Sequence, residues 1–320
     1  MTLHAVRLTR RYESRLWGGE HLATWLNIGD APTPLAETWE VYNDNLICNG
    51  ALQGLTLRQA VQRFGAAFVG QRSYDRYGAE FPLLAKFIDA AQPLSVQVHP
   101  DDAYAHTHEA ASGFHGKTEA WHILAAQPGS DIIQGLIRPM SRTQYADAIA
   151  NGTLDTLLRH VPVHAGDTVF VPAGTIHAIN AGIMLFEIQQ TSDLTYRVYD
   201  YNRRDAHGNL RDLHIAQAIA VSDLGVAAVV PTPPHAHELV RSEFFVMDRF
   251  TAHQPHTWQR PADTFQIVTL IDGAATYTDG AGSAQLTHGD SLVIPAAIAT
   301  STLTPVGSAT WLRCWVPPTK

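Results

Sequence analysis

The hydrophobic positions of the chain fall mainly in short runs that are rich in β-branched and aromatic residues and are bounded by Gly, Pro, Asp or Asn. Such runs are typical of β-strands, because these side chains pack well on a pleated, half-buried surface. The pattern therefore predicts an all-β protein built as a sandwich or barrel. The predicted strands cover residues 81–89, 93–99, 120–127, 167–173, 183–191, 194–201, 264–272, 274–279 and 290–296.

Helices are few in this pattern. Residues 56–65 begin at a Thr and end at a Gly, and residues 141–152 begin at a Ser and also end at a Gly. A polar N-cap and a C-terminal Gly satisfy free backbone groups at the two ends of a helix. Residues 211–223 form a third candidate. We expect these helices to decorate the sheets.

One sequence pattern occurs twice. GDTVFVPAGTIHAI begins at Gly166, and the similar GDSLVIPAAIATST begins at Gly289. Each copy has a Gly-Asp turn, an apolar strand, a Pro and a second turn, which predicts two β-domains of related form. His177 of the first copy aligns with Thr300 of the second. We therefore expect only the first copy to bind a ligand.

The Pro-rich stretch at 229–238 is the predicted linker between the two copies. It divides the chain into residues 1–225, which are expected to carry the functional site, and residues 226–320, which are expected to form a degenerate copy without one.

Charge and hydropathy exclude several classes of function. The 320 residues include 22 Lys+Arg and 30 Asp+Glu, giving a formal net charge of −8 and no basic run, so we expect no nucleic-acid partner. The longest apolar stretch, residues 224–230, is far shorter than the ~20 residues that span a bilayer. The N-terminal segment has no apolar core of a signal peptide, which favours a cytoplasmic protein without a membrane partner. The oligomeric state stays open.

Cysteine and histidine usage directs the search for chemistry. Cys48 and Cys314 lie far apart in the sequence, which excludes a disulfide framework and a thiolate metal site. The 17 histidines indicate metal binding or proton transfer instead. His106 and His108 lie in a predicted short helix, and residues two positions apart do not share a helix face. We therefore expect both to be solvated.

Polar and apolar residues alternate strictly in the run at 93–99. Ser95, Gln97 and His99 therefore point to one face of a strand. Such a face could simply meet solvent. However, Glu119 begins the next predicted strand, and His177 lies at the turn of the first copy. Two imidazoles, a carboxylate and an amide oxygen are together a candidate ligand set for a metal.

These residues resemble the metal site of cupin barrels. The second cupin motif is matched by Gly166, Pro172, Gly174, His177 and Asn180. A longer series of segments, in this order, is similar to type I mannose-6-phosphate isomerase, a zinc-dependent cupin: residues 14–19, 36–41, 82–105, 116–124, 171–179 and 186–204. The resemblance implies an all-β fold of two cupin (jelly-roll) barrels with a few short helices. The resemblance is to the compact bacterial form of the family, because the segment between 138 and 160 is too short for the family's larger helical insertion.

The resemblance implies that Gln97, His99, Glu119 and His177 hold one zinc ion per chain. Nitrogen and oxygen ligands without thiolate suit a catalytic zinc that keeps a position open. Two histidines and a carboxylate could equally form the facial triad of an iron oxygenase. The residues alone therefore leave the metal open.

The implied reaction interconverts mannose 6-phosphate and fructose 6-phosphate through an enediol intermediate. Arg197 matches the family's active-site arginine, and its permanent charge suits it to stabilise or orient a substrate oxygen. Its alternative role is a structural ion pair with Asp193 or Asp200. Lys117 could donate to a substrate oxygen or exchange protons. Glu187 and Asp193 are further candidates for proton transfer, which spacing does not rank.

Further residues are expected to bind the sugar phosphate. Lys86 interrupts an apolar run, so it either faces the cavity or extends to its rim. Trp17 and Glu37 match positions that line the family's pocket. A phosphate dianion favours charge-assisted donors. The candidates for these donors are Ser95, Lys117 and Arg203.

Two other functions compete with the isomerase. For an iron-dependent cupin oxygenase the discriminating residue is Gln97, because an additional protein ligand leaves fewer positions for oxygen and substrate. A non-catalytic sugar-binding cupin would not need Lys117, Glu119 and Arg197 together beside a metal.

Overall fold

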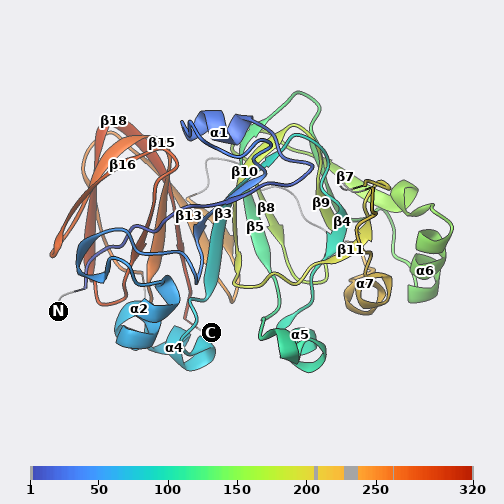
Figure 1. The fold of residues 1–320 in the computed structure, drawn as a ribbon, viewed down its shortest axis with the longest axis horizontal. Helices are drawn as coiled ribbons and strands as arrows, with labels where there is room; N and C mark the ends of the chain where they lie inside the picture. The colour runs from blue at the N-terminus through green and yellow to red at the C-terminus, as the bar shows by residue number, and fades with distance from the viewer. Residues whose placement is uncertain (1–2, 205–207, 227–236, 262, 319–320) are drawn as a thin grey trace.

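The computed structural model describes residues 3–204, 208–226, 237–261 and 263–318, and their strands are antiparallel and form three sheets (Figure 1). The prediction of a mainly β protein is confirmed. The finer prediction of two cupin (jelly-roll) barrels is not confirmed: in the described residues the hydrogen-bonded strand orders are open. The predicted linker lies outside the described residues except at positions 237 and 238.

A six-stranded sheet forms the central layer of the molecule. Its order is β1 (Arg11–Glu13), β2 (Glu37–Val41), β3 (Leu83–Ala90), β10 (Ile183–Gln190), β5 (Glu119–Ala126) and β8 (Thr168–Val171). Every residue of β3 and β10 is buried, because both faces of the sheet are covered. This explains why the sequence shows near-continuous apolar runs at these strands.

A five-stranded sheet packs against one face of the central sheet. Its order is β11 (Tyr196–Tyr199), β4 (Val96–Val98), β9 (His177–Ile179), β6 (Asp131–Leu136) and β7 (Leu158–Pro162). The two sheets share an apolar core in which Trp121, Ile123 and Leu185 meet Ile132 and Ile179. On its outer face the five-stranded sheet carries a second cluster, around the fully buried Tyr145.

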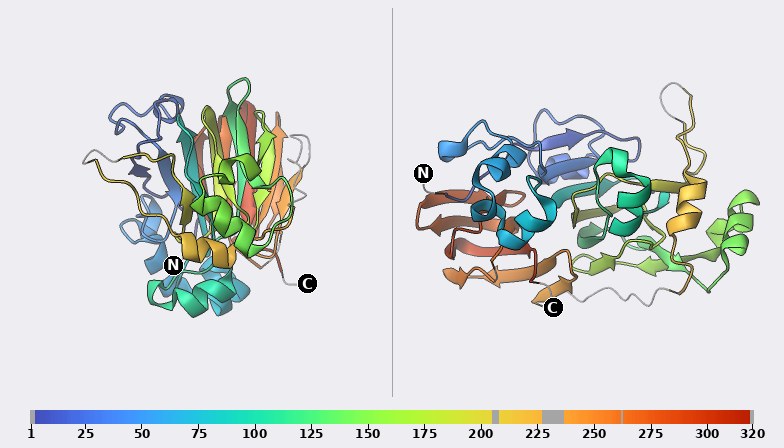
Figure 2. Two further views of the ribbon diagram at one scale, coloured as in Figure 1. Left: turned by 90° about the vertical axis from the view of Figure 1, so that its right-hand side faces the viewer. Right: turned by 90° about the horizontal axis from the view of Figure 1, so that it is seen from below.

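The third sheet covers the opposite face of the central sheet (Figure 2). Its strands are β12 (Glu238–Arg241), β13 (Val246–Ala252), β14 (His256–Gln259), β15 (Gln266–Asp279), β16 (Gly282–Thr287), β17 (Ser291–Ile294) and β18 (Thr300–Trp315). The two strands predicted at 264–272 and 274–279 are one continuous strand. Gly273 has φ +78° at a register shift, so the chain bends there as a bulge and continues.

The repeated sequence pattern forms the same local structure twice. Gly166 and Gly289 both have positive φ, as the turn before each strand requires. β8 and β17 follow, and the next strand begins at His177 in one copy and at the aligned Thr300 in the other.

Short helices occupy the ends and outer faces of the sheets (Figure 1). They are α1 (His21–Trp25), α2 (Leu57–Phe64), α3 (Ala66–Val69), α4 (Gln71–Tyr77), α5 (Asp102–His108), α6 (Arg142–Ala150) and α7 (Ile215–Val221), with 3₁₀ turns at Gly50–Leu52, Ala110–Ser112 and Leu154–Leu157. Thr56 and Ser141 form capping boxes, which confirms two predicted helix starts. None of the helices in the described ranges is long and apolar enough to cross a membrane.

The largest hydrophobic cluster joins the two predicted domains. Phe87 and Phe186 of the central sheet pack in one cluster with Phe265, Met247 and Leu312 of the third sheet. The boundary at 225/226 stays a prediction, but neither segment buries this cluster alone.

We therefore expect the chain to unfold in a single cooperative transition. Guanidinium unfolding curves followed by tryptophan fluorescence and by far-ultraviolet circular dichroism should coincide. A chain ending at residue 225 should not fold, because it would expose the shared cluster. Two separated transitions, or a folded fragment of residues 1–225, would contradict this expectation.

Candidate metal centre and active-site cavity

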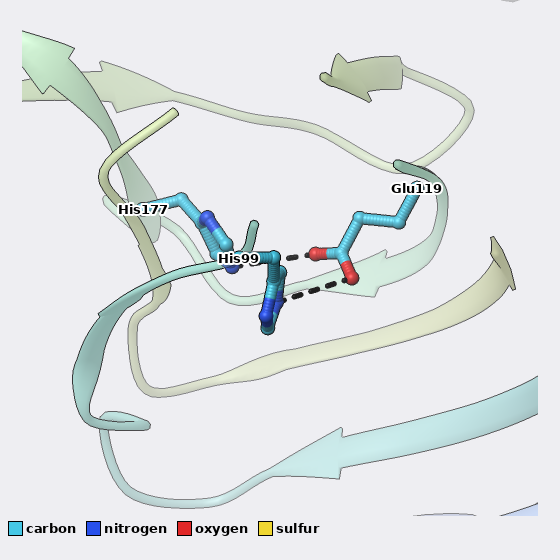
Figure 3. A group of neighbouring side chains, drawn as sticks. All are labelled: His99, Glu119 and His177. Atoms are coloured by element: carbon cyan, nitrogen blue, oxygen red, sulfur yellow. Dashed lines mark ion pairs between the residues drawn. The ribbon is translucent and has the colours of Figure 1, made fainter. Parts of the chain in front are cut away.

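Three of the predicted metal ligands converge on one point (Figure 3). Glu119 begins β5 on the central sheet, His177 begins β9 on the facing sheet, and His99 directly follows β4. His99 Nε2 lies 3.5 Å from Glu119 Oε2, and His177 Nε2 lies 3.4 Å from Glu119 Oε1. All three side chains are buried. Their ligand atoms lie within 4.8 Å of one another, which is the arrangement that a bound metal requires.

Hydrogen bonds orient both imidazole rings toward this point. His99 Nδ1 lies 2.7 Å from the Leu194 carbonyl oxygen, and His177 Nδ1 lies 2.8 Å from that of Thr175. A ring that donates from Nδ1 to a carbonyl keeps its Nε2 lone pair for a metal. The amide nitrogen of Gln97 lies 3.3 Å from His177 Nε2, so the fourth predicted ligand borders the same point. The donor set thus fits the implied zinc ion.

Burial and neighbouring charges keep the ligands in their metal-binding protonation states. Burial, reinforced by the Lys117 ammonium, lowers the pKa of His99 well below its usual value. Burial also lowers the pKa of His177, against the opposing effect of Glu119. For Glu119 burial acts to raise the pKa, but Lys117 and His177 outweigh it and the pKa is lowered.

A cavity of about 530 Å³ opens between the two sheets beside these ligands. Its wall includes both charged and aromatic side chains. Predicted residues in the wall are Trp17, Glu37, Lys86, Ser95, Gln97, Lys117 and Arg197, joined by Glu187 and Asp193. The predicted polar face of residues 93–99 is therefore turned toward the cavity.

Two rows of cross-strand neighbours face this cavity. On the five-stranded sheet Arg197 pairs with Gln97, and Gln97 pairs with His177. On the central sheet Lys86 pairs with Glu187. Directly paired residues point to the same face of a sheet. Strand register thus places Arg197 beside the metal ligands and Lys86 beside Glu187.

Buried charges on the central sheet form an alternating series. Lys86 Nζ lies 3.1 Å from Glu37 Oε2 and 3.3 Å from Glu187 Oε1, and Lys117 Nζ lies 2.8 Å from Glu119 Oε2 and 3.7 Å from Glu187 Oε1. Burial and the Glu119 carboxylate raise the pKa of Glu187, although both lysines oppose this. Burial acts to lower the pKa of Lys86, but Glu187 and Glu37 reverse the effect.

Arg197 has no ion pair with Asp193 or Asp200, the partners that a structural role would require. Asp200 binds Arg203 and Arg211 instead. The Nε atom of Arg197 is buried and has no hydrogen-bond partner among the described residues. The guanidinium is therefore available to a ligand in the cavity.

Two sequence predictions concern residues that lie elsewhere. Arg203 is absent from the described lining of this cavity and borders an adjoining pocket of about 280 Å³, whose lining also includes Arg211. Asp200 and the Pro93 carbonyl oxygen bind its guanidinium, and its predicted phosphate role stays a prediction without support from the cavity lining. His106 and His108 are exposed on α5, as expected, and His106 Nε2 lies 2.9 Å from His115 Nδ1.

Sequence reasoning missed Arg211 and His214, which line the cavity from the segment that leads into α7. Both lie within the stretch 211–223 that the pattern assigned to a helix. The helix begins only at Ile215, so these residues belong to the preceding loop. Their polar character at the start of an otherwise apolar segment was the available signal.

The antiparallel sheets and the buried His/Glu cluster are those of a mainly β protein with a candidate metal site, consistent with the cupin class. The family model for the phosphomannose isomerase type I catalytic domain matches residues 5–121. Mannose-6-phosphate isomerase of Streptococcus mutans is 36% identical over 302 residues, covering 91% of this chain and 92% of that protein. Mannose-6-phosphate isomerase ManA of Bacillus subtilis is 34% identical, covering 89% of this chain and 90% of that protein. The chain therefore belongs to the type I mannose-6-phosphate isomerase family and is an enzyme of that family.

Solved structures of mannose 6-phosphate isomerases have a similar fold. The mannose 6-phosphate isomerase of Bacillus subtilis has a TM-score of 0.84 and 28% identity, covering 98% of this chain and 99% of that chain. A zinc-bound mannose 6-phosphate isomerase has a TM-score of 0.78 at 18% identity, covering 99% of this chain and 100% of that chain. At this identity the second match shows a similarity of fold alone. The isomerases of Streptococcus mutans and Bacillus subtilis favour isomerase activity over the two competing functions, an oxygenase and a non-catalytic binding protein.

Removing the Lys86 ammonium should destabilise the protein strongly. Lys86→Ala leaves Glu37 and Glu187 buried without it, which we expect to cost about 3 kcal/mol of unfolding free energy at neutral pH. The unpaired carboxylates would have raised pKa values in the folded state, so the loss should shrink as the pH falls and they take up protons. Denaturant unfolding at pH 8 and pH 5 measures both effects.

Arg58→Ala is the control, since Arg58 forms a half-exposed pair with Glu80. It should cost less than about 1 kcal/mol. Equal losses for the two variants would show that the Lys86 network does not stabilise the fold.

Proposed function

We propose that the chain interconverts mannose 6-phosphate and fructose 6-phosphate by moving a proton between adjacent carbons through an enediol intermediate, with one zinc ion per chain. The observation that carries this proposal is the convergence of two histidines and a carboxylate at a cavity that also holds buried acids and cations. Gln97, His99, Glu119 and His177 would hold the zinc. When bound, zinc supplies positive charge that stabilises a developing negative charge on a substrate oxygen.

Glu187 is suited to accept and return the proton. It is buried, it lies between Lys86 and Lys117, and its pKa is raised. A raised pKa brings a carboxyl closer to the neutral range, where proton transfer in both directions is efficient. The Trp121 indole donates to its Oε2 atom at 3.0 Å and fixes the orientation of the group. Lys117 can donate to a substrate oxygen from the same side.

Arg197 is proposed to orient the oxygen at the reacting carbons. Its register beside Gln97 places it next to the ligand set, and it has no carboxylate partner in the described chain. A planar guanidinium offers two parallel donors and keeps its charge at neutral pH. Trp17, Ser95 and Glu37 would complete the wall around the sugar.

Metal content should follow the proposed ligands. His99→Ala and His177→Ala each remove one ligand from a buried site, so each variant should lose its zinc and its activity. His106→Ala is the matched control, because His106 is exposed on α5. Elemental analysis and an isomerase assay coupled to fructose 6-phosphate measure the two properties. Chelation should also abolish activity.

An equal loss of zinc and activity in all three variants would mean that the metal site lies elsewhere. Two zinc equivalents per chain, or full activity in excess chelator, would contradict the single catalytic metal.

Arg197→Lys tests the role of the guanidinium. The variant keeps the positive charge but loses the two-donor fork, so kcat should fall by ~10²-fold or more while zinc content is retained. Steady-state kinetics and metal analysis of the same sample check this. A fall in kcat of less than tenfold would assign Arg197 to a structural role.

A further inference from the structure

The cavity wall beyond Arg197 carries additional cationic groups. β11 is an edge strand, and the segment leading into α7 is bonded to it: His214 N donates to the Arg197 carbonyl oxygen at 2.8 Å, and Arg197 N donates to His214 Nδ1 at 3.3 Å. Arg211 lines the same part of the cavity. Burial, and after it the Arg211 charge, lowers the pKa of Arg197. Two guanidinium groups in the wall of one cavity favour an anionic ligand.

Asp200 holds Arg211 in a fixed position. Its carboxylate accepts from Arg211 Nε and Nη2, both at 2.6 Å, and also binds Arg203. Burial acts to raise the pKa of Asp200, but the two arginines outweigh it, so the group is ionised at neutral pH. Two guanidinium charges share one carboxylate, which leaves a net positive charge. Arg211 Nη1 forms no hydrogen bond within the described part of the chain.

We propose that Arg211 and His214 form the subsite that binds the substrate's phosphate group, and that Asp200 is the positioning residue for Arg211. This inference rests on the proposed function, because it assigns the phosphate end of that substrate. The strand order runs from His177 on β9 through Gln97 on β4 to Arg197 on β11, and Arg211 and His214 follow beyond this edge.

This placement matches the shape of a sugar phosphate. The reacting carbons lie at one end of the open sugar chain and the phosphate at the other. A molecule whose reacting end lies at the metal ligands and beside Arg197 therefore extends toward Arg211. Because Asp200 accepts from Nε and Nη2, the Arg211 guanidinium is held in place and its Nη1 can donate to phosphate with little loss of side-chain entropy. The remote phosphate can then contribute binding energy to the reaction.

Arg203 provides a matched comparison for Arg211. Both arginines bind Asp200, but only Arg211 lines the cavity. With the zinc-loaded full chain, we would measure kcat and KM for mannose 6-phosphate and the inhibition constant of inorganic phosphate. Arg211→Gln should raise both KM and the inhibition constant by ~10–100-fold, as expected for loss of a charged hydrogen bond. Arg203→Gln should change either value by less than ~3-fold.

The specificity ratio gives an independent readout. The ratio of kcat/KM for mannose 6-phosphate to that for free mannose should fall by ~10-fold or more in Arg211→Gln, because only the phosphorylated sugar uses the subsite. Arg211→Lys should recover part of the loss, and it replaces Arg211→Gln if that variant does not fold. His214→Gln should raise the inhibition constant of phosphate by several-fold.

The positioning role of Asp200 requires a double-mutant cycle. Asp200→Asn should weaken inhibition by phosphate by ~3–10-fold in the otherwise unchanged chain and have no further effect in the Arg211→Gln background. A similar additional loss in both backgrounds would assign Asp200 to general support of the fold.

The two proposals fail in different ways. Equal effects of Arg203→Gln and Arg211→Gln, or unchanged phosphate inhibition in Arg211→Gln, would overturn the subsite while the isomerase activity stands. If the chain does not isomerise mannose 6-phosphate but calorimetry shows phosphate binding that depends on Arg211, the proposed function fails and the anion subsite stands.

Discussion

Burial of the central sheet on both faces is the constraint on which the rest of the structure depends. Each polar side chain of β3, β5 and β10 must find a partner within the protein, because water does not reach these strands freely. Lys86 and Glu187 meet this requirement by facing the cavity and pairing with each other, and Glu119 meets it by its ion pair with Lys117. Their apolar neighbours fill the clusters on both sides of the sheet. The layer that holds the molecule together is therefore also the layer that concentrates charge at the site.

The charged series has consequences for the chemistry of the site. Three carboxylates, from Glu37, Glu119 and Glu187, share two ammonium groups, and Glu187 is the one whose pKa is raised. Positive charge near Glu119 stabilises its ionised form, whereas the neighbouring Glu119 carboxylate favours the protonated form of Glu187. The environment thus shifts the pKa values of two adjacent carboxyl groups in opposite directions, as the proposed roles of ligand and proton carrier require.

The sequence predicted the local patterns well and the long-range geometry only in part. Alternation at 93–99 placed Gln97 and His99 on one face because a strand has a side-chain period of two. The bulge at Gly273 escaped prediction, since a glycine between two apolar runs is equally typical of a turn. Arg211 escaped prediction, because the pattern assigned residues 211–223 to a helix. Arg203 and Arg211 both contact Asp200, and only their position relative to the cavity distinguishes them.

The second copy of the repeated pattern has a structural explanation. It lacks the ligand histidine, because Thr300 occupies the aligned position and its hydroxyl donates to Gln259 Oε1 at 3.0 Å. Its sheet instead supplies Phe265, Met247 and Leu312 to the cluster that covers the outer face of the central sheet. Without this cover, the apolar face of β3 and β10 that carries Phe87 and Phe186 would meet water, and the two strands would lose much of the packing that holds them together. The second copy thus supports the site through the packing of the central sheet, in which Lys86 and Glu187 are held as cross-strand neighbours.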